Sequence, residues 1–315
     1  AQIDKGTGLM MMCSAGDVTD IQFFREMKLK PVIAITKEGR MNNIAKQFEG
    51  LKVKEAREKI IEELKKNSLI VKQENIVHRT PVSERSGAEI EFIQMPEYYL
   101  KQLEFLPKIK KLLSKITFCP ENSRNILTRW LDTIAIDWPI SRRRFYATPI
   151  PLWRSEDLIA IPEKGKYYEP TKEQVPKNAT VYQNGKKLGK ASDFKNNIWI
   201  GEERVFDTWF DSSISELNMI QYPSDFAKKA YPISLRPQGK EIVRTWLYYT
   251  ILRGYLETNE LPFKEVWIHQ HILDAQGKKM SKSAGNGIDP QDILKTHGAE
   301  AFRFWAALEG NLAEQ

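Results

Sequence analysis

The chain of 315 residues lacks the features that mark several large classes of protein. Its two cysteines, Cys13 and Cys119, exclude a disulfide scaffold and any four-cysteine zinc site. No stretch approaches the roughly 18 consecutive apolar residues that a membrane span needs. The first residues contain neither an initiator methionine nor an apolar signal segment. The start reads like the middle of a strand, so we expect a fragment of a longer protein.

The composition is that of a folded, basic protein. Hydrophobic residues make up 41% of the chain and charged residues 28%, values that exclude wholesale disorder. The 48 Lys and Arg residues exceed the 41 Asp and Glu residues by seven, which fits a polyanionic partner and equally an ordinary basic protein. The length indicates about two domains.

Hydrophobic periodicity predicts alternating helices and strands, the pattern of an α/β fold. Thr19 or Asp20 can cap a first helix, and Pro107 should interrupt the helix predicted around it. Residues 163–192 are rich in Lys, Gly, Pro and Asn, which indicates a surface insertion or a small β-hairpin. We expect strands at 9–13 and 31–35, and helices at 53–67, 96–116, 123–134, 241–256, from 289 or 290, and 298–308.

The sharpest chemical signal is the run Lys-Met-Ser-Lys-Ser at residues 279–283. Two lysines three positions apart, with hydroxyl groups between them, can hold a phosphate chain from one side. Gly277, Gly285 and Gly287 flank the run and let the backbone come close to a ligand. Ammonium groups placed there would stabilise the charge that develops on a departing pyrophosphate. For an arbitrary sequence, a solvated basic loop would be the better interpretation.

This run is identical to the signature loop of class I aminoacyl-tRNA synthetases, and its surroundings match as well. The apolar segment 266–274 resembles the last strand of that family's Rossmann domain, and residues 298–303 resemble the start of the helix after the loop. Residues 137–146, 207–214 and 237–246 resemble the valine-specific branch of archaeal type. The Gly-Ser-Asp-Gln and Arg-Gly-Trp-Phe segments typical of the isoleucine branch are absent. The resemblance implies the C-terminal half of a Rossmann-type catalytic domain and part of an α/β editing domain.

The resemblance implies roles for several residues in binding ATP. Lys282, assisted by Lys279, would stabilise the transition state of adenylate formation, and Gly239 with Glu241 would hold the ribose. Glu241 could equally be a carboxylate favoured by a helix dipole. His269 would lie near the adenine. The ATP-binding set implied by the family is Gly239, Glu241, His269, Met280, Ser281 and Ser283, with Lys279 and Lys282 as the catalytic pair.

The same resemblance assigns an amino-acid pocket and an editing site. Trp209 and Trp246 would wall the pocket for valine, because flat apolar surfaces suit a side chain without hydrogen-bonding groups. Either could instead be an ordinary core tryptophan. The Gly-Thr-Gly at residues 6–8 and the aspartates at 17 and 20 resemble the editing domain of this branch. Asp20 would bind the α-amino group of a misacylated residue and Asp17 the threonine hydroxyl, while a helix cap is the alternative for both.

These assignments divide the chain into residues 1–135 (editing), 136–288 (catalytic, with an insertion near 155–195) and 289–315 (the start of a helical stem-contact region). The sequence holds no His-x-Gly-His motif, which class I members place after their first Rossmann strand. We therefore expect the isolated chain to be inactive without its N-terminal half. The expected partners are tRNA(Val), valine, ATP and Mg²⁺ in the cytoplasm, with no zinc and no membrane. An isoleucine-specific fragment and a non-catalytic tRNA-binding module are the alternatives.

Overall fold

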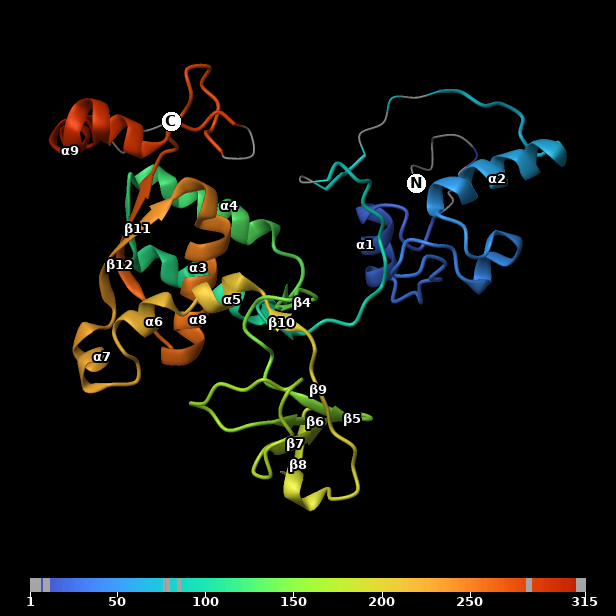
Figure 1. Cartoon of the computed structure of the whole chain (residues 1–315), viewed down its shortest axis with the longest axis horizontal. Coiled ribbons are helices and arrows are strands. Elements are labelled where there is room, and N and C mark those ends of the chain that lie inside the picture. The colour runs from blue at the N-terminus through green and yellow to red at the C-terminus, as the bar shows by residue number, and fades with distance from the viewer. Residues whose placement is uncertain are drawn as a thin grey trace. The chain divides into compact units, whose positions relative to one another are not determined.

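The computed structural model describes residues 7, 12–75, 77, 80–83, 86–281 and 285–309. The chain forms two compact units, Ala1–Pro96 and Glu97–Gln315 (Figure 1), and each is described by itself. Residues 117–119 belong to the second unit, because they pair with a strand far along the chain. The predicted division into editing, catalytic and stem-contact regions stays a prediction. Gly6 and Gly8 of the Gly-Thr-Gly that resembles the editing domain, and most of the expected strand 9–13, lie outside the described residues.

The first unit is built from helices and loops. Its elements are α1 (Val18–Glu26), a 3₁₀ segment (Asn43–Phe48) and α2 (Val53–Lys66), so the helix predicted at 53–67 is confirmed. Ala56 is buried, and the amide of Lys52 donates to Glu55 at the helix start (3.1 Å). The strand expected at 31–35 is wrong, since only an isolated bridge between Ile35 and Met41 forms there.

A three-stranded parallel sheet organises the second unit and confirms the α/β class. Its order is β11 (Ile233–Gly239), β12 (Phe263–His269) and β2 (Thr117–Cys119). β11 and β12 run in register from Ile233 opposite Phe263 to Gly239 opposite His269. The connection between these two strands contains α8 (Tyr248–Thr258), as a parallel crossover requires.

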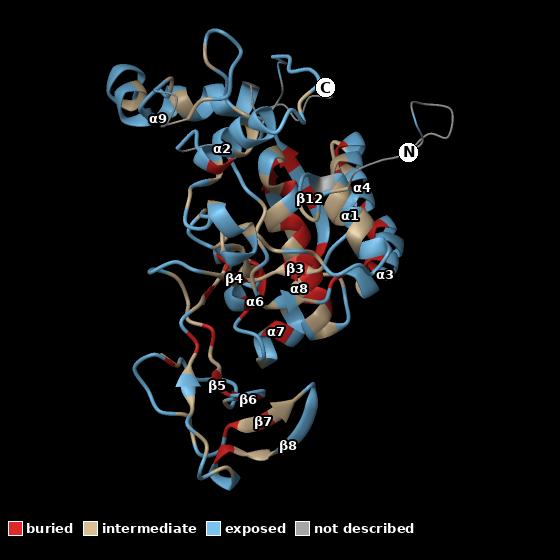
Figure 2. Cartoon of the chain, turned by 90° about the vertical axis from the view of Figure 1, so that its right-hand side faces the viewer, coloured by how far each residue is buried: buried red, intermediate tan, exposed pale blue. Residues whose placement is uncertain are grey.

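Helices pack on this sheet and supply its core, which Figure 2 shows in red. α3 (Leu106–Leu112) and α4 (Arg124–Thr133) contribute Ile109 and Leu127, and α8 contributes Tyr248, Ile251 and Leu252. The helix predicted at 123–134 is confirmed. The helix predicted at 96–116 forms as an α-helix only over Leu106–Leu112, between 3₁₀ turns at Leu103–Phe105 and Leu113–Lys115. Pro107 lies in the first turn of α3, where its missing N–H costs nothing, so it begins this helix and does not interrupt it.

The helix predicted at 241–256 is not regular. A 3₁₀ turn (Lys240–Ile242) and a π-helical turn (Val243–Leu247) precede α8. Hydrophobic spacing over one turn cannot distinguish these forms from an α-helix, so the sequence could not show the change. Trp246 lies in the π-helical turn, a form that occurs often at functional sites.

A second sheet confirms the expected hairpin and enlarges it. Five antiparallel strands have the order β8 (Lys186–Lys190), β7 (Thr180–Gln183), β6 (Leu158–Ile161), β5 (Trp153–Ser155) and β9 (Ile200–Gly201). Asn184 and Gly185 both have positive φ, +49° and +78°, and form the tight turn between β7 and β8. Trp153 and Val181 are buried in a small core beneath these strands.

Short elements complete the second unit. Two strand pairs are formed by β1 (Tyr99–Leu100) with β3 (Trp138–Pro139), and by β4 (Ser141–Arg142) with β10 (Val205–Phe206). The remaining helices are α5 (Thr208–Ser212), α6 (Ser215–Met219), α7 (Asp225–Ala230) and α9 (Pro290–Glu309), with 3₁₀ turns at Leu103–Phe105, Leu113–Lys115, Glu121–Ser123 and Ala191–Asp193. Gly298 (φ +79°) breaks α9, which agrees with the two helices predicted there. Across the described residues, no helix is long and apolar enough to cross a membrane.

One buried carboxylate stands out in the second unit. Glu216 of α6 is 2% exposed, and neither of its carboxylate oxygens accepts a hydrogen bond from another described residue. Burial raises the pKa of Glu216 to about 7, although the charges of Arg236 and Arg253 pull it the other way. The folded protein therefore keeps a proton that the unfolded chain releases near pH 4.5.

The unmodified protein should become less stable as the pH rises from 4.5 to 7, because Glu216 is protonated in the folded state. Glu216→Gln should abolish this dependence on pH. In that window the unfolded state binds fewer protons than the folded state, so the free energy of unfolding falls, by at most about 3 kcal/mol. Urea unfolding of both proteins across the window measures the difference in slope. Glu260→Gln, which changes an exposed carboxylate, is the control. Equal slopes for Glu216→Gln and the unmodified chain would contradict the assignment.

Candidate functional site

A cavity of about 570 Å³ lies at the carboxyl ends of the parallel strands. Ligands bind at this edge of open α/β sheets, because the loops that follow the strands converge there. The cavity receives residues that follow β2, β11 and β12. Its lining consists of Pro120, Asn122, Ser123, Asn125, Ile126, Arg129, Lys240, Glu241, Arg244, Ile268 and Gln270.

The lining combines positive groups with one carboxylate. Arg129, Lys240 and Arg244 supply three cations, and Glu241 supplies the single negative charge. Asn122 and Gln270 add neutral hydrogen-bonding groups. Cations attract phosphate groups, whereas an ionised carboxylate accepts hydrogen bonds from hydroxyl groups. The cavity therefore suits a phosphorylated ligand that also carries hydroxyl groups, as a nucleotide does.

Gly239 and Glu241 lie together at this edge. A Cβ atom on Gly239 would sit 2.8 Å from the Glu241 carboxylate, so the missing side chain gives Glu241 its position. Nδ1 of His271 lies 3.5 Å from the same carboxylate. The sequence predicted Gly239 and Glu241 as one subsite, and the structure brings them into contact. Their role toward a ribose remains a prediction.

His269 ends β12 directly opposite Gly239 in the register of the sheet. Its side chain is exposed, and Nδ1 lies 3.2 Å from the carbonyl oxygen of Gln270. The structure thus places His269 at the same edge as Gly239 and Glu241, but outside the lining of the cavity. Its assignment to the adenine stays a prediction.

The lysine-rich loop after β12 is held by two residues that the sequence analysis did not single out. Asp274 accepts hydrogen bonds from the amides of Gln276 (3.0 Å) and Lys278 (2.7 Å) and from Asn286 Nδ2 (2.6 Å). Asn286 also accepts from the amide of Ser281 (3.0 Å) and donates to the carbonyl of Lys279 (3.2 Å). The hydrogen bond from Asn286 lowers the pKa of Asp274, assisted by the amide of Lys278.

These contacts hold Lys279 and Ser281, in the first part of the signature run. Lys279 is exposed, while Met280 and Ser281 are half-buried. Lys282 and Ser283, predicted as a catalytic and a nucleotide-binding residue, lie outside the described residues. No sequence periodicity links Asp274 to Asn286, so only the resemblance to a known loop could have drawn attention to them.

Trp209 and Trp246 lie on neighbouring elements. Trp246 Nε1 donates to the carbonyl of Ser212 at the end of α5 (3.0 Å) and lies 3.3 Å from Ser215 Oγ. Trp209 belongs to α5, is half-buried and packs against the main core. Neither tryptophan lines the cavity at the strand ends. The structure supports a shared surface near α5, and their role in a valine pocket stays a prediction.

Asp17 and Asp20 differ in their local roles. Asp17, and not Thr19 or Asp20, caps α1, where Asp17 Oδ1 accepts from the amide of Asp20 (2.9 Å). Asp17 also lines a cavity of about 670 Å³ in the first unit, together with Thr19, Arg57 and Glu89. The Asp20 carboxylate lies beside Gly16, where a Cβ atom would be only 2.5 Å from Oδ2. Helix capping therefore accounts for an aspartate at position 17 but not for one at position 20.

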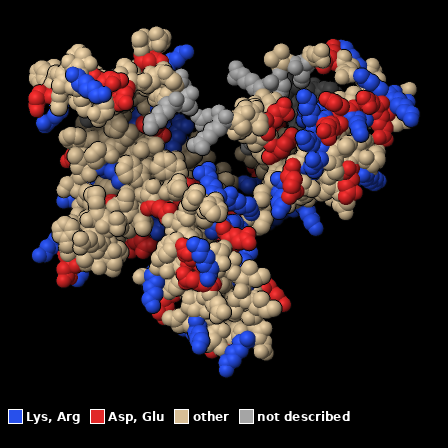
Figure 3. All heavy atoms as spheres, in the orientation of Figure 1, with Lys and Arg blue, Asp and Glu red and all other residues tan. Residues whose placement is uncertain are grey.

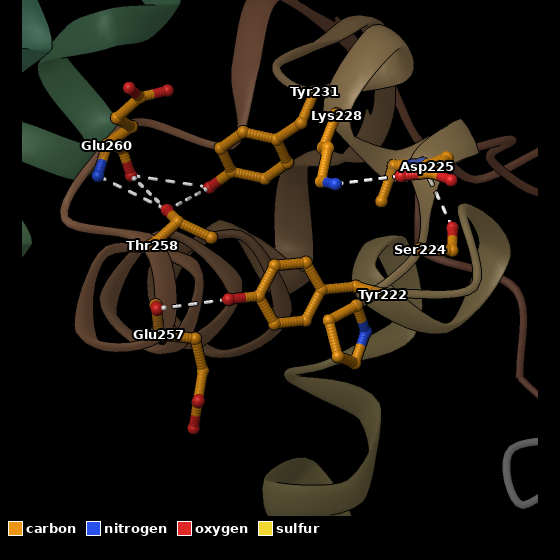
Figure 4. Close-up of a pocket in the computed structure, with 10 residues that line it drawn as sticks. Tyr222, Ser224, Asp225, Lys228, Tyr231, Glu257, Thr258 and Glu260 are labelled. Atoms are coloured by element: carbon orange, nitrogen blue, oxygen red, sulfur yellow. Dashed lines mark hydrogen bonds and ion pairs between the residues drawn. The ribbon is translucent and has the colours of Figure 1, made fainter.

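A further cavity of about 670 Å³ lies at the other end of the sheet (Figure 4). Tyr231 and Glu260 line it and come just before β11 and β12, at their amino ends. Tyr231 accepts from Thr258 Oγ1 (2.8 Å), and Lys228 pairs with Asp225 (2.7 Å). Its polar groups are thus engaged with one another, and the smaller cavity at the carboxyl ends is the better candidate for a nucleotide.

The excess positive charge is not gathered into one area on the face drawn in Figure 3, where acidic and basic side chains are mixed. Within the described part of the chain, no cluster of three His, Cys, Asp or Glu residues could hold a metal ion. The local positive charge of the cavity at the strand ends is therefore the clearest electrostatic feature for an anionic ligand.

Comparison with known proteins identifies the family. The family model described as tRNA synthetases class I (I, L, M and V) matches residues 42–314, and the chain belongs to this family. The chain is 45% identical to a valine--tRNA ligase of Aeropyrum pernix over 313 residues, 98% of the chain and 37% of the relative. A valine--tRNA ligase of Nanoarchaeum equitans is also 45% identical and is covered to 40% of its length. The resemblance to the archaeal valine branch is thus confirmed, and the chain spans less than half of these relatives.

A solved structure, methionyl-tRNA synthetase of Mycobacterium tuberculosis in complex with methionyl-adenylate, matches 73% of this chain and 37% of its own. The TM-score is 0.46 and the identity 19%, too low to support an argument.

We expect Asn286→Ala to loosen the loop that contains Lys279 and Ser281. The change removes the acceptor of the Ser281 amide and the donors to Asp274 and Lys279. Loss of one net hydrogen bond, about 1 kcal/mol, should speed exchange of the Ser281 amide about fivefold. Hydrogen–deuterium exchange of the chain measures this. Gln276→Ala, which shortens an exposed side chain of the same loop, is the control. Equal protection of the Ser281 amide in Asn286→Ala and in the unmodified chain would contradict the role of Asn286.

Proposed function

We propose that this chain is part of an ATP-dependent ligase that activates valine as valyl adenylate and transfers it to tRNA(Val). The cavity at the carboxyl ends of β2, β11 and β12 carries the proposal, because it combines three cations with the Gly239–Glu241 subsite. The choice of valine and its tRNA as substrates in this proposal comes from the relatives named valine--tRNA ligase. The second unit would be the C-terminal half of the catalytic domain.

In adenylate formation, a carboxylate oxygen of valine attacks the α-phosphorus of ATP, and the bond to pyrophosphate breaks. Glu241 would accept hydrogen bonds from the ribose hydroxyls, and His269 would lie near the adenine. Lys279 and Lys282 would offset the negative charge that accumulates on the departing pyrophosphate. Met280, Ser281 and Ser283 would contact the nucleotide along the same loop. Mg²⁺ would accompany the ATP phosphates, and the N-terminal half of the enzyme would complete the site in the cytoplasm.

Selection of the amino acid would depend on Trp209 and Trp246. An apolar wall favours valine but cannot strongly reject threonine, which has nearly the same shape. Valine-specific synthetases are themselves the known example, with discrimination of only about 10² in the pocket. A second, hydrolytic site is then needed. We propose that the first unit supplies it, with Asp20 binding the α-amino group and Asp17 the threonine hydroxyl beside the cavity that Asp17 lines.

Two other functions remain as outcomes of the tests. An isoleucine-specific enzyme would use the same fold, but residues 237–246 favour valine. A tRNA-binding module without catalysis is favoured by the missing His-x-Gly-His motif. The run at 279–283 disfavours that module, because binding alone does not require both lysines beside glycines.

We expect valine-dependent ATP–pyrophosphate exchange by a chimera that restores the rest of the enzyme, and none by the chain alone. Lys282→Ala should lower the exchange rate of the chimera at least about tenfold, roughly 1.4 kcal/mol of transition-state stabilisation. The assay uses the chain alone and a chimera in which it replaces the matching segment of the Aeropyrum pernix relative. Isoleucine and threonine are tested beside valine. Lys264→Ala, at an exposed lysine within β12, is the control. Exchange with isoleucine alone would support the isoleucine alternative, and an unchanged rate in Lys282→Ala would remove its catalytic role.

We expect Asp20→Ala in the chimera to leave adenylation nearly unchanged and to let threonyl-tRNA(Val) accumulate. The helix cap should survive, because Asp17 bonds to the backbone of Asp20 and not to its side chain. Deacylation of threonyl-tRNA(Val) is the measurement, and Glu26→Ala at the end of α1 is the control. Continued clearance of threonyl-tRNA(Val) by Asp20→Ala would overturn the editing proposal.

A further inference from the structure

Arg236 of β11 is a buried arginine with an unusual neighbour. Its side chain is 7% exposed, and its guanidinium carbon lies 3.5 Å from the centre of the Trp246 ring. At that distance the planar guanidinium contacts the face of the indole directly. The ring of Phe263 lies further away, at 5.2 Å. The closest aromatic surface to Arg236 is therefore the tryptophan assigned to the valine pocket.

The hydrogen bonds of Arg236 are long. Nε lies 3.4 Å from Gln238 Oε1, and Nη2 lies 3.5 Å from Thr250 Oγ1. Both exceed the usual N–H···O range. Thr250 itself donates to the carbonyl of Trp246 (2.5 Å). Arg236 is thus linked to Trp246 in two ways, directly by contact with the ring and indirectly through Thr250. The two long hydrogen bonds of Arg236 are too weak to offset the cost of burying its charge.

The counter-charge for Arg236 is also indirect. Glu216 interacts with Arg236 electrostatically, but neither carboxylate oxygen of Glu216 has a hydrogen-bond partner among the described residues. Burial lowers the pKa of Arg236 to about 10, against the attraction of Glu216. A buried cation without a close anion is costly unless another contact offsets it. The indole face of Trp246 is the contact that the structure provides.

Trp246 lies in the π-helical turn, and its indole is restrained along one edge of the ring. The indole Nε1 is fixed by the Ser212 carbonyl and lies near Ser215 Oγ, which restrains one edge of the ring. Restraint at one edge leaves rotation about that edge free, and a flat group stacked on the face removes this freedom. Arg236 is the group that occupies the face.

We propose that Arg236 is a positioning residue that fixes the plane of Trp246 and thereby sets the preference for valine over the larger isoleucine. The proposal rests on the function proposed above, since it requires Trp246 to be a wall of the amino-acid pocket. Lysine at this position would keep the charge but lose the planar surface. The indole would then tilt, and the pocket would hold valine less well and exclude isoleucine less well.

The first test compares Arg236→Lys with Arg253→Lys in valine- and isoleucine-dependent ATP–pyrophosphate exchange by the chimera. Arg253 is the control, because it is a second arginine that interacts with Glu216; it is half-buried and its guanidinium lies over Phe210 (4.1 Å) instead of Trp246. For Arg236→Lys we expect the KM for valine to rise at least about tenfold, with kcat and the KM for ATP nearly unchanged. The ratio of isoleucine to valine activation should rise as well. Arg253→Lys should leave that ratio unchanged.

The second test needs no activity. The chain, with its eight tryptophans replaced by 5-fluorotryptophan, gives ¹⁹F signals, and Trp246→Phe identifies the signal of Trp246. Arg236→Lys should shift or broaden that signal, whereas Arg253→Lys should leave it in place. If Arg236→Lys does not fold, the double variant Arg236→Gln/Glu216→Gln removes both buried charges and tests the same signal.

The outcomes separate this inference from the proposed function. Valine-dependent exchange with an unchanged isoleucine-to-valine ratio in Arg236→Lys overturns the inference and leaves the function standing. No valine-dependent exchange in the unmodified chimera overturns the function, and the ¹⁹F signal then decides whether Arg236 orients Trp246. A lower melting temperature with an unmoved Trp246 signal shows a purely structural role and overturns the inference.

Discussion

The parallel pairing of β11 with β12 is the constraint on which the candidate site depends. The register ends with Gly239 opposite His269, so β11 and β12 end at the same edge of the sheet. Lys240 and Glu241 follow one strand and Gln270 and His271 the other, and these residues meet only because the strands are parallel and in step. A slip of one residue would move Glu241 away from His271 and would turn the side chains of β12 to the other face of the sheet. Pairing with β2 brings a third set of polar residues to the edge and completes the cavity.

Beside this sheet, the second unit tolerates several charged groups in places where hydrophobic residues would be more stable. Glu216 and Arg236 are buried without a direct ion pair to another described residue. Arg253 is half-buried and pairs with Glu257 (3.8 Å), but its Nη1 finds no hydrogen-bond partner among the described residues. Groups of this kind commonly cost stability and persist where they serve a site. Here they surround α5, α6 and the turn that contains Trp246. Arg236 lies against Trp246 and Arg253 against Phe210, so two of these groups contact residues in or beside the predicted amino-acid pocket.

Sequence patterns correctly predicted the helices and turns that are specified by residues close together in the chain. α2 and α4 have enough turns for helical periodicity to be clear, and Asn184–Gly185 has the composition that a tight hairpin turn demands. The strand expected at 31–35 did not form, because a strand needs a partner that the local sequence cannot specify. The division at Pro96 depends on the pairing of β2 with β12, which is equally non-local. For the site, resemblance to a family located Gly239, Glu241 and His269 at one edge, but no pattern indicated Arg236, Asp274 or Asn286, whose contacts join residues without regular spacing.

The π-helical turn at Val243–Leu247 makes this region sensitive to chain length. Each of its hydrogen-bonded loops encloses one residue more than an α-helical loop, and one residue corresponds to about 100° of rotation around a helix axis. Deletion of a single residue would let α8 extend backwards as a regular helix with its buried face intact. Trp246 would then point about a quarter of a turn away from Ser212. Insertions and deletions, and not only side-chain exchanges, are therefore a route by which chains of this fold can acquire a differently shaped surface next to α5.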